Sequence, residues 1–210
     1  MYVADIGVKC PTCGVKFNSR QLPAVLDIGY RNSEFRQFFK GFVPQYEEFF
    51  VVSCPSCGRS DWSTSFEVID EPVYLSAPST TAHLQFRQAA MIAEKEGRSI
   101  YNVGYLYLYA AWCADDKNAL VQAAEYRRLA ADAFGKSMVD GSCPADKRAE
   151  TEYLVGEILR RAGEFAASRE YLAKIVGRLP GPLAIMARKL MRLSEMGDSE
   201  AIDFIAEVGA

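Results

Sequence analysis

Residues 10–14 read CPTCG and residues 54–58 read CPSCG, so the chain contains one five-residue phrase twice with a single conservative change. In each phrase a proline pre-sets φ for a tight turn, and a glycine tolerates the positive φ that turns backbone N–H groups toward the sulfurs. Two such turns can bring together the four thiolates of Cys10, Cys13, Cys54 and Cys57. They predict one tetrahedral metal site, which we expect to be structural because four cysteines leave no open coordination position.

We expect one structural Zn²⁺ in this site, because a duplicated cysteine pair in a reducing compartment is typical of zinc. Iron in a rubredoxin-like site is the alternative, since tetrahedral sulfur ligation does not separate the two metals. A redox role is less favoured, because a redox CxxC normally stands alone at a helix N-terminus. The 40 residues between Cys13 and Cys54 exceed the usual spacing of about 15–20, so we expect them to form an ordered insertion.

The residues around these turns predict a small β-rich, zinc-ribbon-like module over residues 1–75. Strand-like alternation leaves the first turn at residues 15–17, and a further strand is expected within residues 22–30. The stretches QYEEFFVVSC and STSFEVID are expected to enter and leave the second turn as strands. Because the core of so short a module is small, the metal should supply much of its stability.

The insertion contains the aromatic and basic stretch FRQFFKGF at residues 35–42, which has two interpretations. Aromatic rings between basic side chains could stack on nucleic-acid bases. The alternative is that the phenylalanines form the core that joins this module to the rest of the chain. Residues 1–75 hold seven basic and nine acidic residues, opposite to the usual footprint of a nucleic-acid-binding surface, so we favour the core.

After the Pro- and Ser-rich linker EPVYLSAPST the strand signals end, and residues 80–210 predict an all-α domain. The expected fold class is therefore α+β, with the β module followed by a helical domain. Glycines at positions 97, 163 and 197 are candidate helix C-caps. The helices are expected near residues 80–96, 99–113, 117–138, 144–162, 165–177, 182–196 and 199–208.

Residues 150–180, ETEYLVGEILRRAGEFAASREYLAKIVGRLP, resemble a tetratricopeptide (TPR) repeat. Small and signature residues of the repeat fall at Val155, Gly156, Leu159, Ser168, Leu172 and Pro180. Glu152 and Ile175 depart from the pattern, where Trp and Ala are usual. A weaker copy begins near Gly97, with Val103, Gly104 and Tyr107 in the corresponding places. We therefore expect TPR-like helix pairs rather than a regular array.

Taken together, the split CPxCG pair, GYLYLYAAW at 104–112, YLVGEILRRAGEF at 153–165 and IMARKL at 185–190 resemble one bacterial family. That family is known only as the domain of unknown function numbered twenty-two twenty-five. The resemblance covers nearly the whole chain and implies a metal held by the four cysteines, with no established activity. Arg59 departs from the pattern, since many members carry an aromatic residue just after the second turn.

The helical domain also contains a candidate face for a partner. Tyr101, Tyr105 and Tyr109 recur every four residues and so share one side of a helix. In a TPR-like pair this side lines a concave groove, and tyrosine and arginine are favoured at binding hot spots. The corresponding positions on the second helix pair are Tyr153, Glu157, Arg160 and Arg161. The competing interpretation is that the tyrosines pack on a neighbouring helix or on the metal module.

These observations favour a non-enzymatic, zinc-stabilised scaffold or adaptor that binds a protein or peptide through its TPR-like helices. A nucleic-acid-associated zinc ribbon is one alternative, although a net charge of −3 makes nucleic acid an unfavoured partner. An enzyme of unknown reaction with a structural zinc is the other, although no P-loop, HExxH, GxSxG or GxGxxG motif occurs. Without a signal peptide or an apolar run long enough for a membrane span, we expect a cytoplasmic protein.

Overall fold

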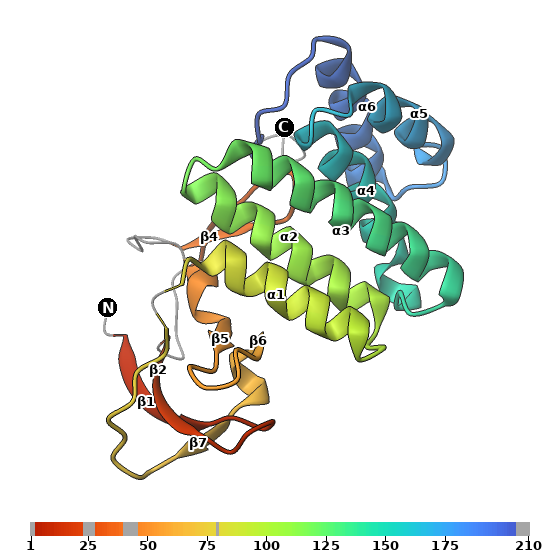
Figure 1. The fold of residues 1–210 in the computed structure, drawn as a ribbon. Coiled ribbons are helices and arrows are strands. Elements are labelled where there is room, and N and C mark those ends of the chain that lie inside the picture. Colours follow the sequence, from red (N-terminus) through yellow and green to blue (C-terminus); the bar gives the residue numbers. More distant parts are fainter. Residues whose placement is uncertain (1–2, 23–27, 40–45, 79, 205–210) are drawn as a thin grey trace.

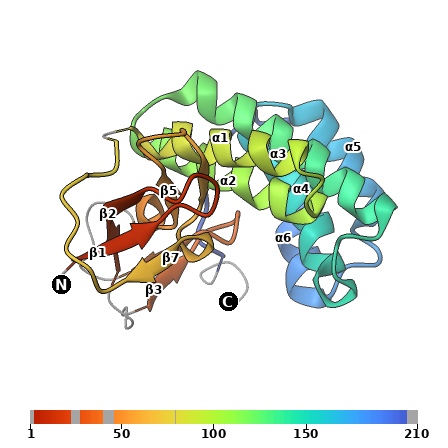
Figure 2. The ribbon, with the colours of Figure 1, turned by 60° about the horizontal axis from the view of Figure 1, so that its bottom comes forward.

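The computed structural model describes residues 3–22, 28–39, 46–78 and 80–204, and it confirms the α+β class. Most of the strands gather at one end of the molecule, and the helices extend away from that end (Figure 1). Figure 2 shows the same division from below, with β1, β2 and β7 on one side and α3 to α6 on the other. None of the described helices is both long and apolar enough to cross a bilayer.

The strands form three small antiparallel sheets rather than one continuous sheet. They are ordered β2-β1-β7, β3-β4 and β5-β6. Short 3₁₀ turns, η1 (Tyr46–Phe49) and η2 (Ser63–Ser65), precede β5 and follow β6. The strands are β1 (Ala4–Lys9), β2 (Lys16–Gln21), β3 (Ile28–Arg31), β4 (Gln37–Phe39), β5 (Val51–Ser53), β6 (Ser60–Trp62) and β7 (Glu67–Ile69).

Helices begin after the linker, and successive helices pack against one another (Figure 1). Gly97, Gly163 and Gly197 all have positive φ directly after a helix, which confirms the three predicted C-caps. A 3₁₀ turn, η3 (Ala145–Lys147), leads into the fourth helix. The helices are α1 (Ala82–Lys95), α2 (Ile100–Asp116), α3 (Leu120–Asp140), α4 (Arg148–Arg161), α5 (Phe165–Ile175) and α6 (Gly181–Glu195).

Two glycines let neighbouring helices approach closely. A Cβ atom on Gly156 of α4 would lie 2.3 Å from Leu172 of α5, and one on Gly104 of α2 would lie 2.7 Å from Phe134 of α3. Both distances are shorter than non-bonded carbon atoms tolerate. The small residues that the sequence placed at helix contacts therefore do lie at helix contacts.

The strand region is fastened to the helices by a shared aromatic core. Phe50, just before β5, and Trp62, the last residue of β6, pack around the ring of Tyr109 in α2, with ring centroids 5.9 and 5.5 Å away. Phe86 of α1 stacks on the same tyrosine at 5.4 Å. The residues expected to form a separate module, 1–75, therefore contribute to the main hydrophobic core of the helical region.

Residues 32–36 reach further into the helical region than the sequence suggested. Phe35 has a φ of 62° and packs against the rings of Tyr153 and Phe204, so the predicted role of this phenylalanine in joining the two regions is confirmed. Phe38 stacks on Tyr30 instead. Phe42, which was expected in the same core, lies outside the described residues.

Three local predictions were wrong. The stretch STSFEVID does not run as one strand, because residues 63–65 form a 3₁₀ turn and only residues 67–69 are extended. Residues 46–49 form a 3₁₀ turn and not the start of a strand, so only residues 51–53 of QYEEFFVVSC are extended. The helix expected at 199–208 is not formed at residues 199–202, because backbone carbonyls there accept hydrogen bonds from arginines of α4. Residues 205–210 lie outside the described part of the chain.

Candidate metal centre

The first CPxCG phrase forms the turn that joins β1 to β2. The N–H of Cys10 donates to the carbonyl of Val15 at 2.9 Å, and the N–H of Gly14 donates to the carbonyl of Cys10 at 3.0 Å. Gly14 has a φ of 72°. This left-handed conformation closes the turn and is inexpensive only for glycine, which explains why the phrase ends in that residue.

The second phrase repeats this geometry between β5 and β6. The N–H of Cys54 donates to the carbonyl of Arg59 at 2.8 Å, and the N–H of Gly58 donates to the carbonyl of Cys54 at 3.1 Å. Gly58 has a φ of 73°, within a degree of its counterpart. The repeated phrase thus forms the same cysteine turn twice, as the sequence predicted.

The two turns face each other and bring all four sulfurs together. The Sγ atoms of Cys10 and Cys57 are 3.8 Å apart, and those of Cys13 and Cys54 are 3.6 Å apart. All four sulfurs lie within 4.8 Å of one another. Four sulfurs at about 2.3 Å from a tetrahedral ion are about 3.8 Å apart. The four cysteines are therefore close enough to hold a single tetrahedral metal ion.

The site is half enclosed by protein. Cys10 and Cys54 are buried, whereas Cys13 and Cys57 are exposed. The backbone N–H of Val15 lowers the pKa of Cys13 to about 7, while burial raises the pKa of Cys54 to about 12. A bound cation deprotonates its thiol ligands outright and so removes this difference. An ion in this site is expected to bind all four cysteines as thiolates.

Residues next to the second turn attach the site to α1. The side-chain amide of Gln88 donates to the carbonyl of Gly58 at 2.7 Å. Arg59 contacts Glu96 just beyond the end of α1, at 2.7 Å. Arg59 also pairs with Asp61 of β6 at 2.8 Å. The metal turn therefore lies directly against the helical region.

The three tyrosines of the predicted partner face are half-buried and packed against other rings. Tyr105 lies 5.0 Å from Phe134 of α3, and Tyr101 lies 5.8 Å from the same ring. Tyr109 is enclosed between the strand region and Trp112. This face is therefore largely used for packing α2 against α3 and against the strands.

The second half of the predicted face is wrong, because Tyr153, Glu157 and Arg160 have no exposed surface. Residues 198–200 and 32–36 cover this side of α4. Arg160 donates to the carbonyls of Asp198 and Glu200, at 2.6 and 2.7 Å, and to Glu157 at 2.7 Å. These residues hold chain segments that are distant in sequence and cannot reach an external partner.

Arg161 is partly exposed, but its charge is also directed inward. Its Nη2 atom lies 3.0 Å from Asp115 at the end of α2, and its Nε atom lies 3.6 Å from Glu34. Glu34 belongs to a buried group of charges that the sequence analysis did not find. One feature of the sequence points to this group of charges. Arg127 lies on α3 among the small apolar residues that contact α2.

Comparisons with known proteins were made for the whole chain. Neither the curated proteins nor the solved structures contain a match. One family model, described as an uncharacterised protein conserved in bacteria (DUF2225), matches residues 77–193, which cover the linker end and all six described helices except the last two residues of α6. Because this match spans more than half of the chain, the chain belongs to the DUF2225 family of uncharacterised bacterial proteins.

Proposed function

We propose that this chain is a zinc-stabilised scaffold that binds a protein or peptide partner and catalyses no reaction of its own. The observation that carries the proposal is the closed sulfur cluster, in which four thiols lie within 4.8 Å of one another. Four thiolates complete the tetrahedral shell of Zn²⁺ and leave no position for water or substrate. A metal held in this way stabilises the fold and does no Lewis-acid chemistry.

The buried carboxylate of Glu34 supports a structural role. Burial alone would raise the pKa of Glu34, but the adjacent Arg127 overrides it and lowers this pKa to about 2. The carboxylate is completely buried and held by two hydrogen bonds from that arginine. A general acid or base needs a pKa near the working pH and contact with substrate. Glu34 has neither.

The two regions are expected to act together toward the partner. The second cysteine turn is hydrogen-bonded to α1 through Gln88, and the β5–β6 pair contributes to the core around Tyr109. Loss of the metal would therefore disturb the surface that the strands and helices form together. As thiolate ligands require a reducing compartment, we also propose that the protein works in the cytoplasm.

The test is reconstitution with a purified partner. Proteins captured from the native bacterium by the wild-type chain are compared with those captured by a Cys54→Ser variant, and each candidate is then expressed, purified and titrated by calorimetry. We expect one candidate to bind the wild-type chain directly and to bind the variant much more weakly. Turnover of a small molecule by the zinc-loaded chain would contradict the proposal.

A nucleic-acid-binding zinc ribbon is distinguished by its dependence on salt. The acidic balance of residues 1–75 leads us to expect no tight complex with RNA or DNA. Filter binding at several salt concentrations measures this directly. A complex that weakens steeply as salt increases would favour that alternative instead.

A further inference from the structure

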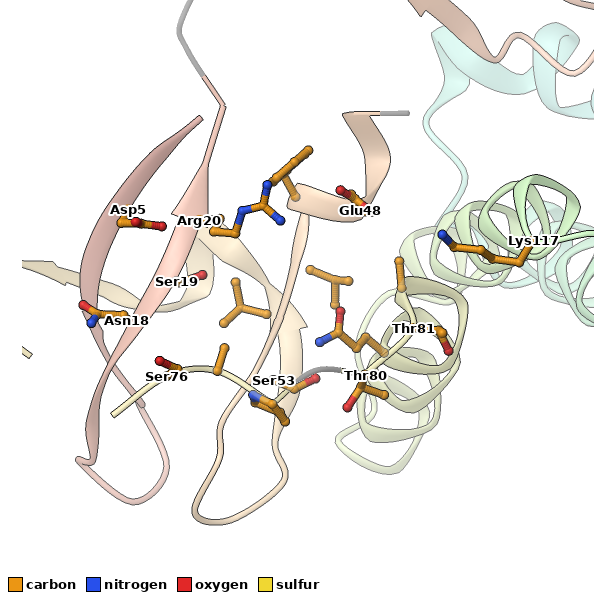
Figure 3. A pocket seen from close by; sticks show the side chains of 17 residues that line it. Asp5, Asn18, Ser19, Arg20, Glu48, Ser53, Ser76, Thr80, Thr81 and Lys117 are labelled. Atoms are coloured by element: carbon orange, nitrogen blue, oxygen red, sulfur yellow. The ribbon is translucent and has the colours of Figure 1, made fainter. Parts of the chain in front are cut away.

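A cavity of about 500 Å³ lies where the strand region, the linker and the first helix meet (Figure 3). One wall is β2, the opposite wall is β5, and the end of the linker with the first turn of α1 forms a third side. The metal site and the predicted tyrosine face lie elsewhere. The volume is within the range of about 300–1,000 Å³ that is typical of ligand pockets.

Both strands turn an edge toward this cavity. Three consecutive residues of β5, 51–53, line it, as do 18–20 of β2. Since successive side chains of a strand point to opposite faces, a wall made of three consecutive residues is the edge of that strand. An edge presents backbone N–H and C=O groups, which are the groups that an added strand would pair with.

The backbone groups on the β5 edge lack partners within the described residues. Cys54 donates its N–H to Arg59, and Phe50 accepts from Ser63, so the residues facing β6 are 50, 52 and 54. Val51 and Ser53 therefore turn their N–H and C=O groups the other way, and β5 pairs with β6 alone in the described chain. Both residues are buried. Buried backbone groups are nearly always hydrogen-bonded, so this edge needs a partner.

Part of the β2 edge is already hydrogen-bonded to the linker. Asn18 donates to Leu75 at 2.6 Å and accepts from Ala77 at 3.0 Å, so the linker covers this position. Arg20, two residues further along β2, turns its backbone N–H and C=O groups to the same side as Asn18. The linker does not extend to it. The linker thus pairs with one part of the edge and leaves the next part open to the cavity.

Two buried side chains in the cavity wall also lack partners. Gln85 is 8% exposed and Ser19 is 7% exposed, and neither side chain has a hydrogen-bonding partner in the described part of the protein. The amide of Gln85 is not among the fully buried side-chain atoms of the described residues that lack a partner, so it remains accessible to solvent. A carboxamide offers both donors and an acceptor, which suits the N–H and C=O of a peptide bond.

The α1 end of the cavity favours negative charge. The N–H groups of Ala82 and His83 have no acceptor among the described residues, and Thr81 provides no side-chain cap. Lys117 also lines this end of the cavity. The burial of His83 and the positive charge of Lys117 both lower the pKa of His83. A helix N-terminus beside a lysine attracts a carboxylate. Of the lining carboxylates, Asp5 is on β1 at the far side of the cavity in Figure 3, whereas Glu48 is on η1, which also contacts α1.

We propose that this cavity binds an extended peptide segment of the partner as an added strand along β5. Its backbone pairs with Val51 and Ser53, the amide of Gln85 bonds one of its peptide groups, and an Asp or Glu side chain of the segment lies at the N-terminus of α1. Strand addition supplies affinity through main-chain hydrogen bonds. This proposal rests on the proposed function, because it names the class of partner and the place where it binds.

The experiment uses the full chain and a displayed library of random ten-residue peptides. Enriched peptides are synthesised with both ends blocked, so that only side chains carry charge, and their Kd is measured by fluorescence anisotropy. Gln85→Leu removes the amide at similar volume. Gln122→Leu, at an exposed position of α3 that does not line the cavity, is the matched control. Single N-methylated peptides test the main-chain hydrogen bonds, and Asp→Asn or Glu→Gln peptides test the carboxylate.

We expect enriched acidic peptides that bind Q85L at least tenfold more weakly, with less than a twofold change for Q122L. N-methylation at alternate positions should weaken binding at least tenfold, and hydrogen exchange should become slower at residues 51–53. Failure to enrich any peptide, or equal binding to Q85L, would overturn this proposal. Peptides that protect the helices instead would reject the cavity and leave the scaffold function standing.

Discussion

Glu34 and Arg127 lie 93 positions apart in the chain and form a two-point ion pair inside the protein. The Nε atom of Arg127 is 2.7 Å from Oε1 of Glu34, and its Nη2 atom is 2.8 Å from Oε2. Trp112 donates its indole N–H to the same carboxylate at 3.1 Å. One acidic residue of the insertion thereby joins α2 and α3 at their contact.

A second buried arginine, Arg36, joins the insertion to the end of α2. Arg36 binds Glu47 on one side and Asp116 on the other, at 2.7 and 2.6 Å. Both arginines are buried and both have a second acidic partner at the end of α2. Pairs of this kind are costly to break because they leave a buried charge without a counter-charge. They hold the insertion and the helices in one arrangement.

Replacing Arg127 by Met should destabilise the protein by about 3–5 kcal/mol, because Glu34 is left charged and buried. The double variant Glu34→Gln with Arg127→Met should recover a large part of this loss. Urea unfolding of the wild type, both single variants and the double variant gives the coupling energy. Additive effects of the two substitutions would show that the pair is not coupled.

Stability should fall with acidification in a way that depends on Glu34. Its pKa is about 2 in the folded protein and about 4.3 in an unfolded chain, so its contribution is fully present above about pH 4.3 and is lost as the pH falls toward 2. Between about pH 6 and about pH 3.5 the wild type should lose roughly 1 kcal/mol more than Glu34→Gln. The free energy of unfolding is measured by urea denaturation at each pH. An equal fall of this free energy with pH in the two proteins would contradict the assignment to Glu34.

Gly156→Ala should destabilise the protein by about 1–3 kcal/mol, because the added Cβ would lie 2.3 Å from the buried Leu172. Gly135→Ala on α3 is the matched control, since a Cβ there meets nothing within 4 Å. The control should be stabilised by up to about 1 kcal/mol through helix propensity. Chemical denaturation followed by circular dichroism measures both. Similar effects of the two substitutions would argue against a close contact at Gly156.

The purified chain should contain about one equivalent of zinc, which elemental analysis determines directly. Cys54→Ser should lose the metal and unfold the strands around it, with faster proteolysis there than among α3 to α6. Cys113→Ser, at a buried position outside the cluster, is the control and should keep the metal. A red iron-loaded protein would identify the other metal, and a metal-free wild type would exclude a metal role for the cluster.

Tyr105→Ala should cost about 3 kcal/mol or more of stability, because its ring packs on Phe134. Tyr74→Ala, at a residue that is 95% exposed, should change stability by less than about 0.5 kcal/mol. Thermal unfolding compares the two variants. A Tyr105→Ala protein of normal stability that loses its partner would restore the predicted role of this face in binding.

Local sequence was sufficient for the cysteine turns and for most helix ends. In CPTCG and CPSCG the turn depends on the proline and the glycine themselves, and a C-cap such as Gly163 depends on the positive φ of one residue. Such features arise from neighbours along the chain, so the metal turns and the order of the main helices were predictable, whereas the strands β1, β4 and β6 were not expected. The contact positions Gly104 and Gly156 were predictable for the same reason.

Burial was decided only by the tertiary structure. Tyr153, Glu157 and Arg160 occupy suitable positions for a groove, yet residues 32–36 and 198–200 cover them, and nothing near them in the sequence shows this. The same holds for Val51 and Ser53, which are buried and line a cavity only because β2 and α1 lie opposite them. Periodicity shows which residues share a face of a helix or strand. Only packing between distant segments determines what covers that face, since burial depends on contacts that loop closure brings together.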